Sequence, residues 1–427
     1  MFIKIFLIFI ILPGFLYSAE IKSNNNVNTG TLLEDKSLSG LTWENVLFLA
    51  KEKNPVLKQQ EESVKLANLN YYKSKTNFLP NLSASASSSK SGINNSGLTD
   101  QYSYGISGNL SIFNGFNDTT ELKIKSIEMK IADLEYKRIF SDTVYNLKKS
   151  FIELLWAQEM VALTEKILQK RRQNSELVKF KYDSGREDKG SLLRVEADES
   201  QAEYELAKAK RNLKTVSTQL AKEIGLDRFD VIVVTGSFSV NRPTENFSSI
   251  ELIKQTPEYL IAEYALKKTI YSINKAESEF YPVVSISGNT SKSESSGNDR
   301  WSVGLNLSYP FFPGGRNIYD LRIAKTDTII AQENFRETTL TLLAKIESTA
   351  NSFIDSVDNV KVREKYLLAS EEQSEITTMK YVNGLVSYYE WYTVENDYIN
   401  SQKSLLNAKK DAIVSEAYWK NVLGLGE

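Results

Sequence analysis

The strongest constraint on the fold is a stretch in which apolar and small polar residues alternate up to Ile112. Successive side chains of an extended strand point to opposite faces. One face would carry the apolar residues Tyr102, Tyr104, Ile106, Leu110 and Ile112. The other would carry the small residues Ser103, Gly105, Ser107, Asn109 and Ser111. A Ser/Asn/Gly-rich run at 91–100 predicts a loop, and alternation before it makes residues 81–113 a predicted hairpin.

The same arrangement returns at residues 283–312, with a polar run at 291–299 as its predicted loop. The second strand places on one face Trp301, Val303, Leu305, Leu307 and Tyr309. The opposite face receives Ser302, Gly304, Asn306 and Ser308. Each strand is predicted to be about 9–11 residues long, which suffices to cross a bilayer at the tilt of a β-barrel. The pattern predicts one face toward outer-membrane lipid and one toward a lumen; the alternative is a half-exposed hairpin in a soluble sheet.

Composition narrows the possible functions. The 427 residues carry a formal net charge of −2, whereas a nucleic-acid partner would require a basic face. The sequence contains no Cys and no His. Histidine-based triads, cysteine nucleophiles and the usual zinc or iron sites therefore lack their residues. The inventory predicts a protein that is not an enzyme and holds no metal or cofactor.

The first 19 residues predict a secretory signal peptide, with an apolar core at 5–12 and small residues, Ser18 and Ala19, at the cleavage position. Residues 20–40 are polar and Asn-rich and predict a flexible segment. Because no Cys follows the cleavage position, no N-terminal lipid anchor is expected. No later apolar run is long enough for a membrane helix. These features favour a periplasmic protein, a secreted protein or an outer-membrane barrel.

The chain also repeats itself. Pro55 recurs as Pro257, 202 residues later, and beyond the hairpins the offset becomes 199, as between Gly185 and Gly384. The change falls within the hairpins, where loops tolerate deletions. The duplication predicts a first repeat at 41–226, an inter-repeat linker at 227–248 and a second repeat at 249–427. Each repeat is predicted to be a helix, a hairpin, a very long helix, a tip turn and a further helix.

The predicted long helices span 117–182 and 316–380 and would each measure about 100 Å at 1.5 Å per residue. Their apolar residues recur at three- and four-residue spacing and so form one face of each helix. The opposite faces are rich in Lys, Glu, Gln and Asn. No single globular domain buries such helices, so antiparallel coiled coils are expected. Tip turns at 183–190 and 381–387 would join each long helix to the next one.

Four strands per chain cannot close a barrel, and an open strand edge is not tolerated in lipid. Closure therefore requires several copies, most simply related by cyclic symmetry. A dimer would supply eight strands, and side chains fill the interior of an eight-stranded barrel. A trimer would supply twelve strands, and a barrel of that size can hold an aqueous lumen. The small polar faces suit the wider barrel.

With these features the chain resembles the TolC-type outer-membrane efflux channels over roughly residues 41–425. The resemblance rests on the duplicated plan, on the strand exits Phe113-Asn-Gly115 and Phe312-Pro-Gly-Gly315, and on the segment Tyr381–Tyr388. It implies a homotrimer with a twelve-stranded transmembrane β-barrel and a tunnel of long helices in the periplasm. It also implies a periplasmic adaptor (membrane fusion protein) and an inner-membrane pump, in a tripartite efflux pump or a type I secretion system that exports drugs or proteins. The competing hypothesis is an exported structural coiled-coil protein without a pore.

The residues predicted at the tips are Gly185, Ser191, Tyr381, Gly384 and Glu390. The two glycines are expected to end the long helices in the left-handed conformation. The resemblance implies that the tips contact the adaptor and form the periplasmic gate, with Tyr381 as a gate residue and Ser191 at the position of its partner. It further implies that Glu390 from each copy forms a ring of carboxylates, which would favour cations. The alternative is that Glu390 is an ordinary solvated helix residue.

Overall fold

Two helices of 67 residues each, α4 (Asn117–Asp183) and α8 (Arg316–Val382), organise the chain in the computed structural model. The structure describes residues 39–93, 96–227, 231–240, 249–293 and 299–426. The predicted signal peptide and most of the predicted flexible segment lie outside these residues. The chain divides into two units, Met1–Ser39 and Gly40–Glu427, and the helices of the described residues belong to the second.

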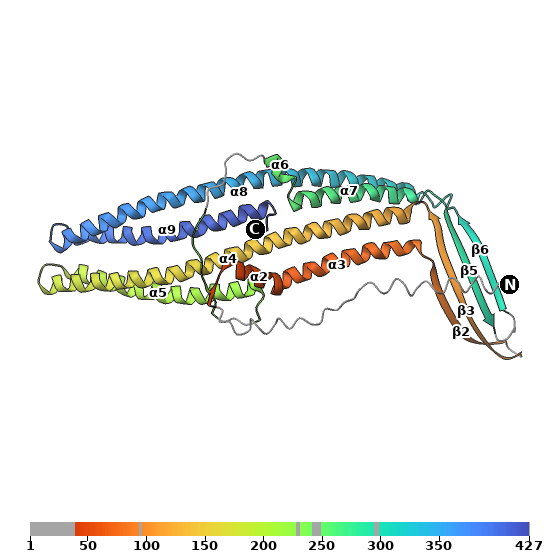
Figure 1. Ribbon diagram of the computed structural model, residues 1–427, viewed down its shortest axis with the longest axis horizontal. Helices are drawn as coiled ribbons and strands as arrows, with labels where there is room; N and C mark the ends of the chain where they lie inside the picture. Colours follow the sequence, from red (N-terminus) through yellow and green to blue (C-terminus); the bar gives the residue numbers. More distant parts are fainter. Residues whose placement is uncertain (1–38, 94–95, 228–230, 241–248, 294–298, 427) are drawn as a thin grey trace. The chain divides into compact units, whose positions relative to one another are not determined.

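Each long helix is paired with shorter ones (Figure 1). The first repeat adds α2 (Trp43–Lys53), α3 (Pro55–Lys75) and α5 (Lys189–Ile224). The second repeat adds α6 (Ser249–Ile253), α7 (Pro257–Ser278) and α9 (Tyr388–Val422). Both α3 and α7 begin with proline directly after a capping side chain, which explains why the same dipeptide pattern recurs.

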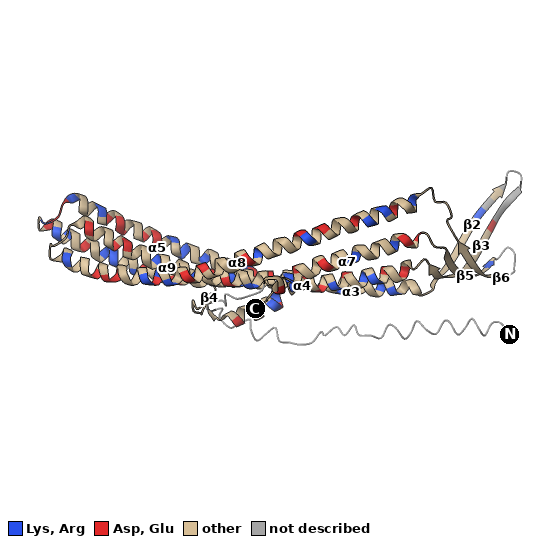
Figure 2. Cartoon of the chain, turned by 90° about the horizontal axis from the view of Figure 1, so that it is seen from above, with Lys and Arg blue, Asp and Glu red and all other residues tan. Residues whose placement is uncertain are grey.

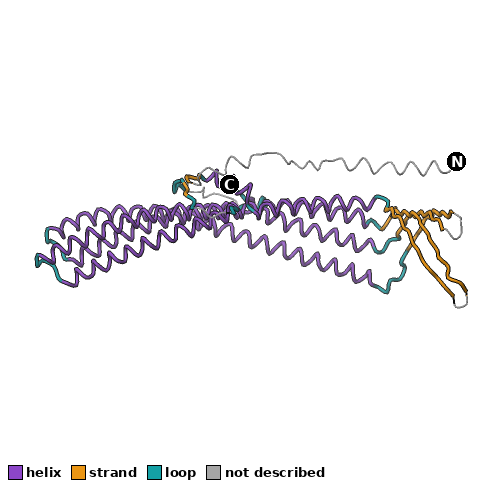
Figure 3. Tube along the Cα trace, turned by 90° about the horizontal axis from the view of Figure 1, so that it is seen from below, coloured by secondary structure: helices purple, strands orange, loops and turns teal. Residues whose placement is uncertain are grey.

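The helices pack as antiparallel neighbours, with α5 along α4, α9 along α8, and α4 in contact with α9, α7 and α3 (Figures 1 and 3). Apolar side chains close the seams, for example Leu147, Phe151 and Leu154 on α4, each no more than 3% exposed. Among the described residues, no helix combines the length and the apolar character that crossing a membrane requires.

Beyond the ends of α3, α4, α7 and α8 lies one antiparallel sheet in the order β2-β3-β5-β6 (Figure 3). Its strands are β2 (Asn81–Ile93), β3 (Ser96–Asn114), β5 (Val283–Ser293) and β6 (Asp299–Ser308). The hairpins of the two repeats are therefore neighbours, joined through β3 and β5. Strands β2 and β6 form the two edges of this sheet.

Several predicted boundaries were wrong in detail. In the first hairpin, β2 and β3 have 13 and 19 residues, longer than the predicted 9–11. Most of the predicted loop at 91–100 belongs to these strands, because the polar residues pair in register and Lys90 forms an ion pair with Asp100 at 3.4 Å. In the second hairpin, β6 ends at Ser308, so Tyr309 follows the strand. Tyr381 lies in the last turn of α8 rather than in the tip turn.

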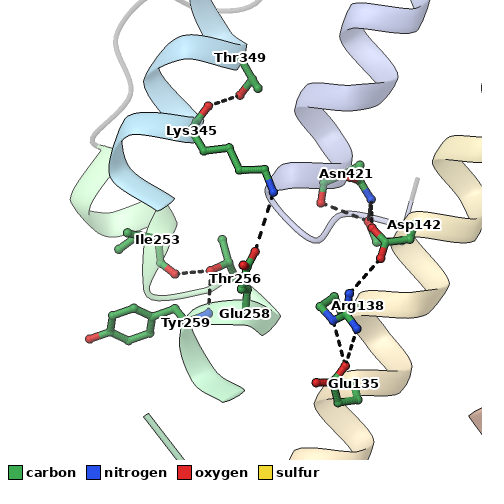
Figure 4. Close-up of polar contacts among 11 residues, drawn as sticks. Glu135, Arg138, Asp142, Ile253, Thr256, Glu258, Tyr259, Lys345, Thr349 and Asn421 are labelled. Atoms are coloured by element: carbon green, nitrogen blue, oxygen red, sulfur yellow. Dashed lines mark hydrogen bonds and ion pairs between the residues drawn. The ribbon is translucent and has the colours of Figure 1, made fainter. Parts of the chain in front are cut away.

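The two repeats also meet near the end of α9 (Figure 4). Asn421 donates a hydrogen bond to Asp142 of α4 at 2.8 Å, and Arg138 bridges Asp142 and Glu135. Close by, α6 packs on α8 through Ile253. The predicted inter-repeat linker contributes a two-residue strand, β4 (Val233–Val234), which pairs with β1 (Ser39–Leu41); its residues 228–230 and 241–248 lie outside the described part.

Candidate functional site

The sheet has one continuous face of small polar residues. Side chains of directly opposed residues in antiparallel strands share a face, so the register alone assigns each residue to a side. The residues predicted to face the lumen all lie on this one side: Ser103, Ser107, Asn109, Ser302, Asn306 and Ser308. Hydrogen bonds along it join Ser83 to Ser107 at 2.7 Å and Asn306 to Ser287 at 2.9 Å.

The opposite face is apolar, and no other described residue covers it. It carries Tyr102, Tyr104, Ile106, Leu110, Trp301, Val303, Leu305 and Leu307. Trp301 is 78% exposed and Leu305 69% exposed, values that a soluble sheet would not leave in a row. Ile112 sits at a register shift between Ser111 and Phe113 and therefore pairs with no residue of β5. Charged residues are sparse on the strands compared with the helices (Figure 2).

The far ends of the long helices form two matched tips. Gly185 and Gly384 have φ values of 69° and 74°, in the left-handed region that glycine adopts without strain. At the first tip Arg186 donates to the carbonyl of Lys181 at 2.8 Å, and at the second Leu385 donates to that of Lys380 at 2.9 Å. These bonds are those of the Schellman motif, so both long helices end in the same way.

Tyr381 is the centre of an aromatic and charged cluster between the tips. Its ring is 2% exposed and stacks on Trp391 of α9, with centroids 4.5 Å apart and planes at 5°. Its hydroxyl donates to Glu187 of the first tip at 2.7 Å. Lys181 lies 3.8 Å from the ring centroid and also donates to the Tyr381 carbonyl. Burial, reinforced by the bond to Glu187, raises the pKa of the Tyr381 phenol well above its usual value, so the hydroxyl remains a donor.

Ser191 does not partner Tyr381 within the chain. Its hydroxyl donates to Asp188 at 3.1 Å, and Asp188 also accepts from the Ser191 amide at 2.9 Å as the cap of α5. The acid that meets Tyr381 is Glu187, two residues after Gly185 rather than six. Sequence reasoning missed Glu187, Lys181 and Trp391. The recurrence of Lys181-Tyr182 as Lys380-Tyr381 was the available signal that Lys181 belongs to the tip.

Two acids of α9 have opposite surroundings. Glu390 is exposed in the first turn, where its amide donates to the capping Ser387 at 3.2 Å. Glu395 is 1% exposed and accepts from Ser374 at 2.5 Å and Thr378 at 3.0 Å, with Lys170 at 3.7 Å. Of these two acids, only Glu390 is therefore available to solvent.

A family model described as outer membrane efflux protein matches residues 46–226 and 251–425, which is each of the two repeats. The chain belongs to this family. This outer membrane efflux protein is 19% identical over 413 residues to the outer membrane efflux protein BepC of Brucella suis biovar 1, covering 93% of this chain and 88% of BepC. It is 22% identical to the cation efflux system protein CusC of Escherichia coli K12, covering 95% of this chain and 90% of CusC. A match to nodulation protein T of Rhizobium leguminosarum bv. viciae, at 21% identity, covers 70% of this chain and 64% of that protein.

Solved structures show the same fold. The Campylobacter jejuni CmeC outer membrane channel superposes with a TM-score of 0.80 at 18% identity, covering 90% of this chain and 86% of that one. The Vibrio cholerae outer membrane protein VceC superposes with a TM-score of 0.76 at 20% identity, covering 90% and 96%. The predicted resemblance, the fold class, the outer-membrane location and the function as an export channel are thereby confirmed. Members of this family are channels rather than enzymes.

Proposed function

We propose that this outer membrane efflux protein works as a homotrimer, in which the four-stranded sheets of three chains join into one twelve-stranded barrel. The observation that carries the proposal is the sheet itself. It has an exposed apolar face, a polar face, and two outer edges, along β2 and β6, that pair with no further strand among the described residues. An unpaired edge is very costly in lipid, whereas closure by symmetry pairs β6 of one copy with β2 of the next.

The polar faces would then line a water-filled lumen, and the paired long helices would continue it through the periplasm as a tunnel. A twelve-stranded barrel is wide enough to leave an aqueous passage. Serine, glycine and asparagine side chains offer little chemical selectivity, so the pump to which the channel is coupled determines the exported substrate, drug or protein.

The helix tips are the proposed contact for a periplasmic adaptor, through which an inner-membrane pump engages. Large apolar side chains are exposed there: Phe180 at 70%, Leu385 at 74% and Tyr389 at 76%. Exposed apolar groups rimmed by charges favour a protein partner. The bond of Tyr381 to Glu187 ties the tip of the second repeat to that of the first, which supports a role in holding the entrance closed.

Crosslinking tests the trimer, and the absence of cysteine from the sequence provides a clean background. Ala84→Cys on β2 combined with Val303→Cys on β6 should, with a flexible bis-maleimide in native outer membranes, give covalent dimers and trimers. The matched control, Ile106→Cys with Ile286→Cys on the inner strands β3 and β5, should crosslink only within one chain. Monomers alone from the edge pair, or oligomers from both pairs, would contradict the proposed barrel.

A further inference from the structure

A cleft of about 490 Å³ lies away from both the sheet and the tips, where α2, α4 and α9 meet the segment that follows β4. One wall is aromatic, with Trp43 against the edge of Phe151 at 5.8 Å between ring centroids. The segment after β4 contributes the exposed hydroxyls of Ser237 and Ser239. The volume is that of sites that bind small ligands or chain ends.

Lys148 of α4 lines this cleft and forms no ion pair with any described acid. Its ammonium lies 4.3 Å from the Trp43 ring centroid and 5.9 Å from that of Phe151. Among the described residues, it forms no hydrogen bond and no ion pair. Burial lowers its pKa, with the nearby Glu416 opposing that shift. A partly desolvated cation over aromatic rings gains from an incoming anion more than a solvated one does.

The other charged residues that line the cleft do not form an ion pair with Lys148. Lys420, on the α9 side, forms its own ion pair with Glu416 at 3.1 Å. Glu44 lines the cleft but is exposed in the first turn of α2, where the helix N-terminus already favours a negative charge. Lys148 is thus the one cation of the described cleft that forms no ion pair with a carboxylate.

A second cleft, of about 410 Å³, on the other side of Asn421 provides a built-in comparison (Figure 4). Its two cations are both matched by acids. Arg138 contacts Glu135 at 2.8 Å and Asp142 at 3.2 Å, and Lys345 lies 3.9 Å from Glu258. A lysine without an ion pair is therefore a feature of the first cleft that the neighbouring second cleft does not share.

We propose that the Lys148 cleft binds the end of a peptide chain through its free carboxylate. The carboxylate would pair with the Lys148 ammonium, the terminal side chain would lie against Trp43 and Leu47, and the hydroxyls of Ser237 and Ser239 would bond the peptide amides. A peptide end fits better than a simple aliphatic acid because the cleft offers these hydroxyls beside its apolar wall.

The test uses the purified full-length protein in detergent and ligand-observed NMR titrations of N-acetyl-leucyl-alanine and of its C-terminal amide. The acid should bind about tenfold more tightly than the amide, the effect of one charge-assisted hydrogen bond. Lys148→Met should abolish the preference and Lys148→Arg should retain it. Glu44→Gln, which removes a negative charge that lines the cleft, should tighten binding of the acid.

Lys345→Met in the second cleft is the matched control and should leave the acid preference unchanged. Equal binding of acid and amide to the unmodified protein would overturn the proposal, as would a preference that survives Lys148→Met. A titration with decanoate tests whether the cleft recognises an aliphatic acid instead. If decanoate binds in a Lys148-dependent manner while neither peptide binds, the cleft recognises an aliphatic acid and the assignment to peptide ends is wrong.

Discussion

The sheet and the junction between the helix tips differ in how their large apolar side chains are shielded from water. In the sheet, large apolar residues are exposed, as with Trp301 at 78% and Leu307 at 70%, and each edge strand is paired on one side only among the described residues. At the tips, by contrast, the stacked pair Tyr381 and Trp391 is enclosed by the chain itself, at 2% and 1% exposure. In the proposed trimer the sheet would be completed by lipid and by other copies, whereas the Tyr381–Trp391 junction between the tips is formed within one copy. Substitutions should accordingly affect assembly in the first region and opening in the second.

The largest expected effect is on the lipid face of the sheet. Leu305→Arg or Leu307→Arg should prevent assembly, because an arginine facing the bilayer midplane costs about 2–4 kcal/mol per chain, and threefold that in a trimer. The matched changes on the polar face, Ser302→Arg and Asn306→Arg, should assemble and lower the conductance. Heat-modifiable oligomers on gels report assembly, and planar bilayers report conductance. Equal assembly defects on both faces would show that the sides of the sheet have been assigned wrongly.

The next effect should appear at the tips. Tyr381→Phe keeps the stack on Trp391 and removes only the hydroxyl that Glu187 accepts from, a bond to a charged group worth about 1.5–3 kcal/mol. The variant should assemble normally and show a higher single-channel conductance in planar bilayers. Tyr389→Phe, at a neighbouring residue that is 76% exposed, is the control and should behave like the unmodified protein. An unchanged conductance for Tyr381→Phe would mean that this bond does not restrain the entrance.

The same contrast explains what the sequence could predict. Alternation reports the surroundings of each residue along one strand, so it predicted both faces of the sheet. The polar ends of β2 and β3 were interpreted as loop because serine, lysine and aspartate carry no such alternation, although Lys90 and Asp100 pair across the strands. The bond from Tyr381 to Glu187 joins residues 194 positions apart, on different repeats. No local pattern indicates which acid of the first tip will meet that tyrosine, and family position indicated Ser191 instead.

A smaller effect should distinguish the two acids of α9. If the exposed Glu390 contributes to a carboxylate ring, Glu390→Gln should move the reversal potential under a salt gradient toward zero and weaken block by multivalent cations. Glu395→Gln should leave selectivity unchanged and lower thermal stability, because its buried carboxylate accepts from Ser374 and Thr378. If selectivity changes in Glu395→Gln and not in Glu390→Gln, the assignment of the carboxylate ring to Glu390 is wrong.

The smallest expected effect is a difference in pH response between the two tips. Asp188 caps α5, and its bonds from the Ser191 amide and hydroxyl lower the pKa of the Asp188 carboxyl. A carboxyl whose pKa is lower in the folded state stabilises that state above its unfolded pKa, about 3.9, and loses this contribution as the pH falls through the folded value. Hydrogen exchange at the start of α5, corrected for intrinsic rates, should therefore accelerate in this acidic range. The start of α9 is capped by the hydroxyl of Ser387, which does not titrate, and provides the internal comparison.

Asp188→Asn keeps an accepting side chain at the cap of α5 and should remove the acceleration of hydrogen exchange. If the acceleration persists in this variant, a different group controls the acid response of the first tip.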